Sequence, residues 1–121
     1  MENVQCKRVY DPYSEEDGIR ILVDRLWPRG ISKEKAKLDY WLKEVAPTNE
    51  LRKWYHHDQG DFEEFKTRYE AELSQGKQKE ALEQLMDLVA ENKGRITLLY
   101  GAKDEVNNQA VILKKMLLEG K

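Results

Sequence analysis

Two short runs of branched apolar residues constrain the fold of this chain more than any other feature. Residues 19–24 and 95–100 are rich in Ile, Leu and Val, and both runs are too short for typical helices. Such runs are typical of strands that are covered on both faces, as the central strands of parallel sheets are. Each run leads into a loop that contains glycine, and a helical pattern follows the second loop. The sequence therefore predicts an α/β domain.

The remaining patterns predict further strands and helices around these two strands. We expect a first strand at 7–10 and a third at 39–45, although a helix is an alternative for the latter segment. Helices are predicted from Ser32 through Lys37, at 49–56 after the N-cap Thr48, and from Asp61 until Gly76 ends the helix. A further helix with Leu82, Leu85 and Val89 as its apolar stripe is predicted to stop at Lys93, and a last one after the break at 101–104 places Val106, Ala110, Leu113 and Leu117 on one side. We expect one domain over residues 1–121, with a mainly parallel sheet of about four strands flanked by helices.

Composition excludes several classes of protein. The 121 residues are 40% hydrophobic and carry a net charge of −2, which argues against a disordered chain and against a generally basic nucleic-acid wrapper. No apolar run approaches the roughly 18 residues of a membrane helix, and the first residues lack a signal-peptide pattern. We therefore expect a cytoplasmic protein without a membrane partner. With one cysteine and two histidines, we expect neither a metal site nor a cofactor.

The loops after the two apolar runs hold the most chemically capable residues. Open parallel sheets bind ligands beyond the carboxyl ends of their strands. The first loop presents Asp24, Arg25, Trp27 and Arg29, and a guanidinium matches phosphate or carboxylate oxygens. The second presents Tyr100, Lys103 and Asp104 ahead of a predicted helix N-terminus, which also favours an anion. This pattern predicts a site for a phosphate-bearing ligand. The alternative is that the arginines pair with carboxylates and Trp27 fills the core.

A histidine pair offers one further candidate. His57 followed by Asp58 could act as a general base with a carboxylate that orients it, because imidazole titrates near neutral pH. The alternative is a histidine that stabilises the end of helix 49–56 through its charge, and which of His56 and His57 faces the site is left open. The sequence contains no P-loop, dinucleotide-binding or serine-elbow motif.

Charge is also unevenly distributed along the chain. Residues 20–37 hold six basic residues against two acidic ones, with Trp27 among them. A basic patch beside an aromatic residue could bind single-stranded nucleic acid, although such a run is more often a solvated surface. A third class of function is an interaction protein without catalysis, in which the same arginines form a salt-bridge network.

Several strings together resemble one protein family. They are residues 24–30 (DRLWPRG), 8–12 (RVYDP), 51–55 (LRKWY), 57–58 (HD) and 98–100 (LLY) with Asp104 and Asn108. They resemble the domain of unknown function 488 family, and within it the YeaO-like bacterial members. The resemblance implies a small α/β domain and carries no established reaction. It also implies that ten residues share one cleft: Arg25, Trp27, Arg29, Arg52, Trp54, His57, Asp58, Tyr100, Asp104 and Asn108.

The chain departs from this family at the start of its last helix. Relatives often carry a His-Asn-His arrangement there, and this chain has Asn107, Asn108 and Gln109. A metal or histidine mechanism at that position would lack its titrating groups, although amides can still hydrogen-bond a ligand.

These observations together predict an anion-binding cleft. We expect Arg25, Arg29 and Arg52 to hold a nucleotide or a phosphorylated metabolite between Trp27 and Trp54. For an enzyme, the reaction would be hydrolysis or group transfer, with His57 and Asp58 as base and Asp104 and Asn108 orienting the substrate.

Overall fold

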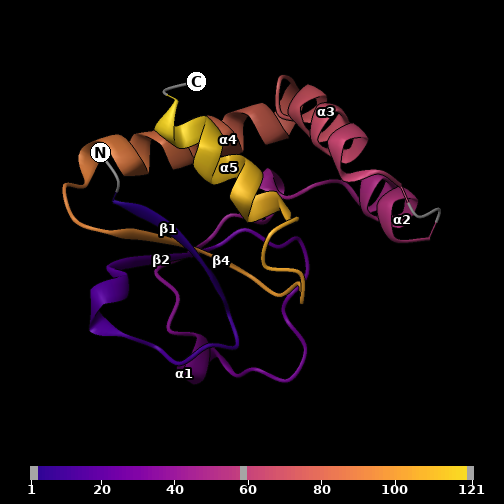
Figure 1. The fold of residues 1–121 in the computed structure, drawn as a ribbon. Helices are drawn as coiled ribbons and strands as arrows, with labels where there is room; N and C mark the ends of the chain where they lie inside the picture. The colour runs from indigo at the N-terminus through magenta and orange to yellow at the C-terminus, as the bar shows by residue number, and fades with distance from the viewer. Residues whose placement is uncertain (1–2, 58–59, 120–121) are drawn as a thin grey trace.

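The computed structural model describes residues 3–57 and 60–119 and arranges them around a four-stranded sheet (Figure 1). Its strands are β1 (Val4–Arg8), β2 (Ile19–Leu22), β3 (Tyr40–Trp41) and β4 (Ile96–Tyr100). They are all parallel and lie in the order β1-β4-β2-β3, so that the two apolar runs form the central strands. The predicted α/β fold with a parallel sheet is confirmed.

In the described residues, five α-helices and two short 3-10 helices connect and flank these strands. They are η1 (Glu15–Asp17), α1 (Lys33–Ala36), η2 (Lys43–Val45), α2 (Asn49–His57), α3 (Phe62–Glu72), α4 (Gly76–Glu91) and α5 (Gln109–Leu118). All three predicted N-caps are present, because Ser32 accepts a hydrogen bond from Lys35 N, Thr48 Oγ1 accepts one from Leu51 N, and Asp61 accepts one from Glu64 N. No helix in the described part of the chain is long and apolar enough to cross a membrane.

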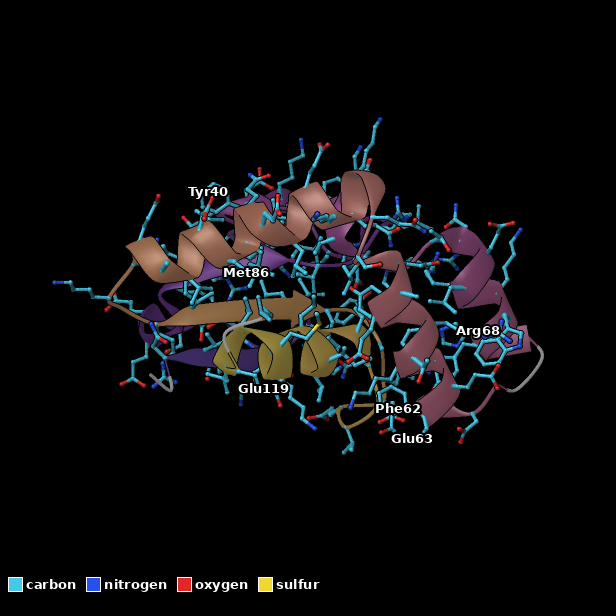
Figure 2. All side chains as sticks on the ribbon, turned by 90° about the horizontal axis from the view of Figure 1, so that it is seen from above. Tyr40, Phe62, Glu63, Arg68, Met86 and Glu119 are labelled. Atoms are coloured by element: carbon cyan, nitrogen blue, oxygen red, sulfur yellow. The ribbon has the colours of Figure 1, made fainter. Side chains whose placement is uncertain are left out.

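The sheet separates two apolar layers of unequal size. Helices α4 and α5 cover one face, and α1 lies on the other side (Figure 1). Figure 2, seen from above, shows α4 and α5 lying over the sheet with α3 and α2 beyond one end of it. Because strand side chains alternate, Ile21 and Leu98 pack under α4 and α5, whereas Leu22 and Leu99 pack on the α1 side. Coverage of both faces explains why β2 and β4 are so apolar.

The boundaries of three elements differ from the prediction. The first strand begins at Val4, ahead of the expected 7–10, because β1 pairs with the whole length of β4. Only Tyr40–Trp41 of the expected strand 39–45 is extended, and Lys43–Val45 forms a 3-10 turn. Gly76 begins α4 and does not end α3; its φ of 66° is one that glycine adopts readily.

The last helix begins later than its apolar spacing predicts. Asp104 Oδ1 accepts hydrogen bonds from the backbone N–H groups of Val106 and Asn107, at 2.9 Å each, and this local turn competes with helix formation. Asn108 then caps α5 by accepting from Val111 N at 3.1 Å. Val106 consequently lies outside the helix and is 72% exposed, so its expected place on the apolar face is wrong.

A buried group of charges lies on the α1 side at the amino-terminal end of β2. Arg20 is 1% exposed and forms an ion pair with Asp17, which is 2% exposed and also pairs with Lys7 Nζ at 3.0 Å. The Arg20 guanidinium also donates two hydrogen bonds to Ala36 O, at 3.1 and 2.8 Å. We call Arg20, Asp17 and Lys7 the buried ion cluster. It ties η1, β1 and α1 to the sheet.

Candidate functional site

A cleft of about 800 Å³ opens where β2 and β4 end. Most of its lining comes from three segments, which are residues 24–29 after β2, one face of α2, and residues 101–109 from the end of β4 to the first residue of α5; Tyr10, Ala46, Pro47, Gly60 and Phe65 complete it. Its volume falls in the range of about 300 to 1,000 Å³ that is usual for small-molecule sites. The cleft lies at the carboxyl ends of the strands, where parallel sheets commonly bind their ligands.

The structure brings some of the predicted site residues together and not others. Those that line the cleft are Arg25, Trp27, Arg29, Arg52, Asp104 and Asn108. Trp54 and Tyr100 are not among the lining residues. Tyr100 is 2% exposed within the core, and burial raises the pKa of its hydroxyl. Asp58 and the side chain of His57 lie outside the described residues.

Arg25 uses most of its donors within the protein. Its Nε donates to Pro47 O at 3.0 Å, and a terminal nitrogen donates to Ala46 O at 2.8 Å. The other terminal nitrogen lies 3.3 Å from Glu44 Oε1. Arg25 therefore fastens the segment before α2 to the end of β2. This geometry fits the alternative in which arginine is part of the framework, and it leaves Arg25 few donors for a ligand.

The two predicted aromatic walls have different surroundings. Trp27 donates its Nε1–H to Ile31 O at 2.8 Å and meets Trp41 edge to face, with ring centroids 5.4 Å apart. It thus lines the cleft and also packs in the smaller apolar layer. Trp54 is covered by Arg68, whose guanidinium carbon lies 4.1 Å from the indole centroid. Its indole therefore packs between α2 and α3.

Three cations of the cleft have no carboxylate partner among the described residues. Arg29 and Lys103 are exposed, and their side chains make no hydrogen bond or ion pair to the residues that the structure describes. Arg52 is half-buried, and within residues 3–57 and 60–119 its one side-chain hydrogen bond goes to Asn49 Oδ1, at 3.1 Å. We call Arg29, Arg52 and Lys103 the cleft cations. Positive charges gathered without counter-charges in a concave site attract anions.

Asp24 also lines the cleft; the sequence placed it in the first loop but assigned it no role in the site. Its Oδ2 accepts from Gly101 N at 2.9 Å, and its Oδ1 accepts from Gln109 Nε2 at 2.5 Å. Burial raises the pKa of this carboxyl, and the two hydrogen bonds and the charge of Arg52 offset only part of that rise. A Cβ at Gly101 would lie 3.0 Å from Asp24 Oδ2, so the close approach favours glycine. The one signal in the sequence was its place directly after an apolar strand.

Asp104 and Asn108 hold the loop that precedes α5. The backbone N–H groups of Asn107 and Val106 lower the pKa of the exposed Asp104 carboxyl, which therefore stays ionised at neutral pH. Asn108 is 4% exposed; its Oδ1 caps α5, and its Nδ2 donates to Asp104 O at 2.9 Å. Both polar atoms of Asn108 are thus engaged in the loop. Asn107 and Gln109 are half-buried and line the cleft beside it.

Tyr55 and His56 form the α2 side of the cleft. Their ring centroids lie 5.2 Å apart, and both residues line the cavity. Burial raises the pKa of the Tyr55 hydroxyl, and the negative charges of Asp104 and Asp61 raise it further. His56 lies on the cleft wall, and the side chain of His57 lies outside the described residues. Tyr55 therefore stays a neutral hydroxyl that can donate or accept a hydrogen bond.

Other predicted features lie away from the cleft. Burial raises the pKa of the Cys6 thiol to about 11, which keeps it protonated. Within residues 3–57 and 60–119, no three His, Cys, Asp or Glu side chains are gathered as metal ligands are. The basic segment 20–37 does not form one surface, because Arg20 is buried and Arg25 is engaged with carbonyl groups.

Comparisons with known proteins agree along almost the whole chain. Residues 3–120 match the family model described as "Inactive DUF488-N3 subclade". The chain is 49% identical over 115 residues to "Uncharacterized protein YeaO" of Escherichia coli (strain K12), which covers 95% of this chain and 96% of that protein. It is 38% identical over 114 residues to an uncharacterized protein of Mycobacterium tuberculosis (strain H37Rv), covering 94% and 92%. No solved structure matches.

Proposed function

The chain belongs to the DUF488 family, and on that premise we propose that it binds a small phosphate-bearing ligand in its cleft without converting it. The observation that carries the proposal is the group of cleft cations, which have no carboxylate partner among the described residues. Unpaired arginine and lysine side chains in a concave site favour an anion with several acceptor oxygens. We place this binding in the cytoplasm.

The surroundings of the cleft cations suit the same class of ligand. The ten-residue helix α5 starts at the cleft wall, and the dipole at its N-terminus favours negative charge. Tyr10 and Tyr55 supply aromatic surface, and about 800 Å³ is room for a nucleotide or a phosphorylated metabolite. Arg25 acts indirectly here, because it holds the segment that leads into α2.

Two observations favour binding without turnover. The matching family model is described as an inactive subclade. In addition, Asn107, Asn108 and Gln109 supply amides where a titrating group would be needed, and the pKa of Asp104 is lowered, so that it offers no proton at neutral pH. Hydrolysis or group transfer with His57 and Asp58 as base stays a prediction.

Calorimetric titration with inorganic pyrophosphate tests the proposal. The wild type should bind, and Arg29→Ala should weaken binding by about ten- to a hundredfold, because a hydrogen bond to a charged group contributes roughly 1.5 to 3 kcal/mol. Lys35→Ala is the matched control, since Lys35 is an exposed cation of α1 that does not line the cleft. Its affinity should equal that of the wild type, and both variants should unfold near the wild-type temperature.

Two results would contradict this proposal. Equal affinities of Arg29→Ala and wild type for pyrophosphate would mean that the cleft does not bind the anion. Tight oligonucleotide binding with a steep dependence on salt, weakened by Lys35→Ala and not by Arg29→Ala, would favour the nucleic-acid alternative.

A further inference from the structure

The cleft contains a carboxylate that the cleft cations do not pair with. Asp24 lines the cavity and is partly buried, and its oxygens accept from two neutral donors, the amide groups of Gly101 and Gln109. An ionised carboxylate has about four acceptor positions on its two oxygens, so two bonds leave others unfilled. Asp24 has no ion-pair partner among the described residues, although the cleft is predominantly cationic. A ligand would have to offer hydrogen-bond donors to Asp24, whereas the cations need acceptor oxygens.

Gln109 extends the acceptor character of this part of the cleft. Its Nε2 is engaged with Asp24 Oδ1 at 2.5 Å and with Val23 O at 3.4 Å. These bonds fix the amide so that its nitrogen faces Asp24, and its Oε1 receives no hydrogen bond from the residues that the structure describes. We call Asp24 and Gln109 the acceptor pair. It presents oxygens, whereas the cleft cations present N–H groups.

We propose that the acceptor pair selects ligands whose phosphate is joined to a neutral group with two adjacent hydrogen-bond donors. This inference rests on the proposed function, because the cleft cations hold the phosphate. Both a sugar diol and the amino edge of a nucleobase have this donor chemistry. The phosphate cannot take the place of that group, because a second anion next to Asp24 would be repelled.

The charge balance of the cleft favours a neutral donor group over a cationic one. Four basic residues line the cavity, Arg25, Arg29, Arg52 and Lys103, against the carboxylates of Asp24 and Asp104. The Arg52 charge already lowers the pKa of Asp24, so Arg52 is close enough for its field to oppose a ligand ammonium group. Neutral hydroxyl or amino donors meet the acceptor oxygens without that repulsion. The ligand is therefore oriented, with its phosphate at the cations and its donors at Asp24.

Three monophosphates of similar charge show whether a sugar diol or a base edge supplies the donors that the acceptor pair binds. Methyl phosphate has no donor group, ribose 5-phosphate has a sugar diol, and dideoxyguanosine monophosphate has a base edge without the diol. Competition against pyrophosphate should show that at least one of the latter two binds about tenfold or more tightly than methyl phosphate, as one or two hydrogen bonds to a charged acceptor would give. Preference for ribose 5-phosphate assigns the diol, and preference for the nucleotide assigns the base.

Variants then test the acceptor pair itself. Asp24→Asn replaces one acceptor oxygen by a donor and removes a negative charge, so it should abolish the preference while methyl phosphate binds at least as tightly as to the wild type. Because Asp24 also accepts from Gly101 N, this variant could fold poorly, and Gln109→Met, which removes the amide while keeping a side chain of similar length, is the second test. It should reduce the preference severalfold.

The outcomes distinguish this inference from the proposed function. If all three monophosphates bind equally in the wild type, or if the preference survives in both variants, the acceptor pair does not select the ligand, although the anion site stands. If neither pyrophosphate nor any monophosphate binds, both proposals are overturned.

Discussion

The two ends of the sheet use charged residues in opposite ways. At the amino-terminal end of β2, Arg20 and Asp17 are almost fully buried, and each buried side-chain nitrogen and oxygen atom described there has a hydrogen-bond partner. At the carboxyl end, Arg29 and Lys103 are exposed in a cleft and form no ion pair in the described part of the chain. The first arrangement holds segments of the fold together. The cations of the second arrangement form no ion pair with a described residue that would stabilise the fold.

This difference indicates where stability and where binding reside. Removal of one member of a buried ion pair leaves the other charge buried without compensation, which is costly. Removal of an exposed, unpaired cation relieves repulsion or changes little. Mutations at the amino-terminal end should therefore change the free energy of unfolding, and mutations at the carboxyl end should change ligand affinity.

The largest expected effect is on stability, at the buried ion cluster. Arg20→Met should lower the free energy of unfolding by about 3 to 5 kcal/mol, because it leaves Asp17 buried with Lys7 as its one remaining cation. Urea denaturation measures this loss, and Lys35→Met, at an exposed position, is the control. A loss below about 1 kcal/mol would mean that the cluster resembles a surface ion pair and that the two ends do not differ.

An intermediate effect is expected at the start of α5. Asn108→Ala should cost about 0.5 to 2 kcal/mol of stability, because its side chain caps the helix. Asn107→Ala is the matched control, since Asn107 lines the cleft and its side chain does not cap α5. Thermal unfolding and pyrophosphate titration should show reduced stability for Asn108→Ala alone. Weaker binding by Asn108→Ala with unchanged stability would instead make Asn108 a ligand contact, as the sequence prediction had it.

The smallest expected effect is a pH dependence of opposite sign at the two aspartates. Burial opposes ionisation of Asp17, but the hydrogen bond and charge of Lys7, the Ser14 backbone N–H and the hydrogen bond from Arg20 outweigh it and lower its pKa below 3.8. Asp17 therefore contributes stability that is present above pH 3.8 and is lost as the pH falls through its folded pKa. The pKa of Asp24 is raised, so its ionisation reduces stability as the pH rises above 3.8.

Urea titrations from about pH 6 down to about pH 3 test these signs. The loss of unfolding free energy caused by Asp17→Asn should shrink toward the acid end. The unfolding free energy of Asp24→Asn relative to the wild type should be most favourable at the higher pH. The same trend for both variants would contradict the contrast between the two ends.

The sequence predicted the parts of the fold that depend on local patterns. The apolar runs at 19–24 and 95–100 identified the central strands, and Ser32 and Asp61 marked two helix starts through their ability to accept backbone N–H groups. The predicted start of α5 was wrong. The apolar spacing indicated that the helix begins by Val106, but the hydrogen bonds from Val106 N and Asn107 N to the Asp104 side chain form a turn there instead. A local hydrogen bond overrode the periodicity.

The candidate site was harder to predict because tertiary partners decide which charges are available. Arg20 lies inside an apolar run, yet only the fold brings Asp17 and Ala36 O to it. Arg25 and Arg29 lie four residues apart in the same loop, and the sequence alone does not distinguish them. Arg25 donates hydrogen bonds to the carbonyl groups of Ala46 and Pro47, and no local pattern predicts where those carbonyl groups lie. The roles of Arg29 and Arg52 as ligand contacts stay predictions.

The most direct test of the central claim is a titration of the isotope-labelled protein with pyrophosphate, followed by backbone and arginine side-chain resonances. We expect the shifts to concentrate at residues 24–29 and 101–109 and at the guanidinium groups of Arg29 and Arg52, while Arg20 stays unchanged. Shifts that centre on α1 and the basic residues 33–37, with the cleft unaffected, would contradict the claim that the unpaired cations at the carboxyl end of the sheet form an anion-binding site.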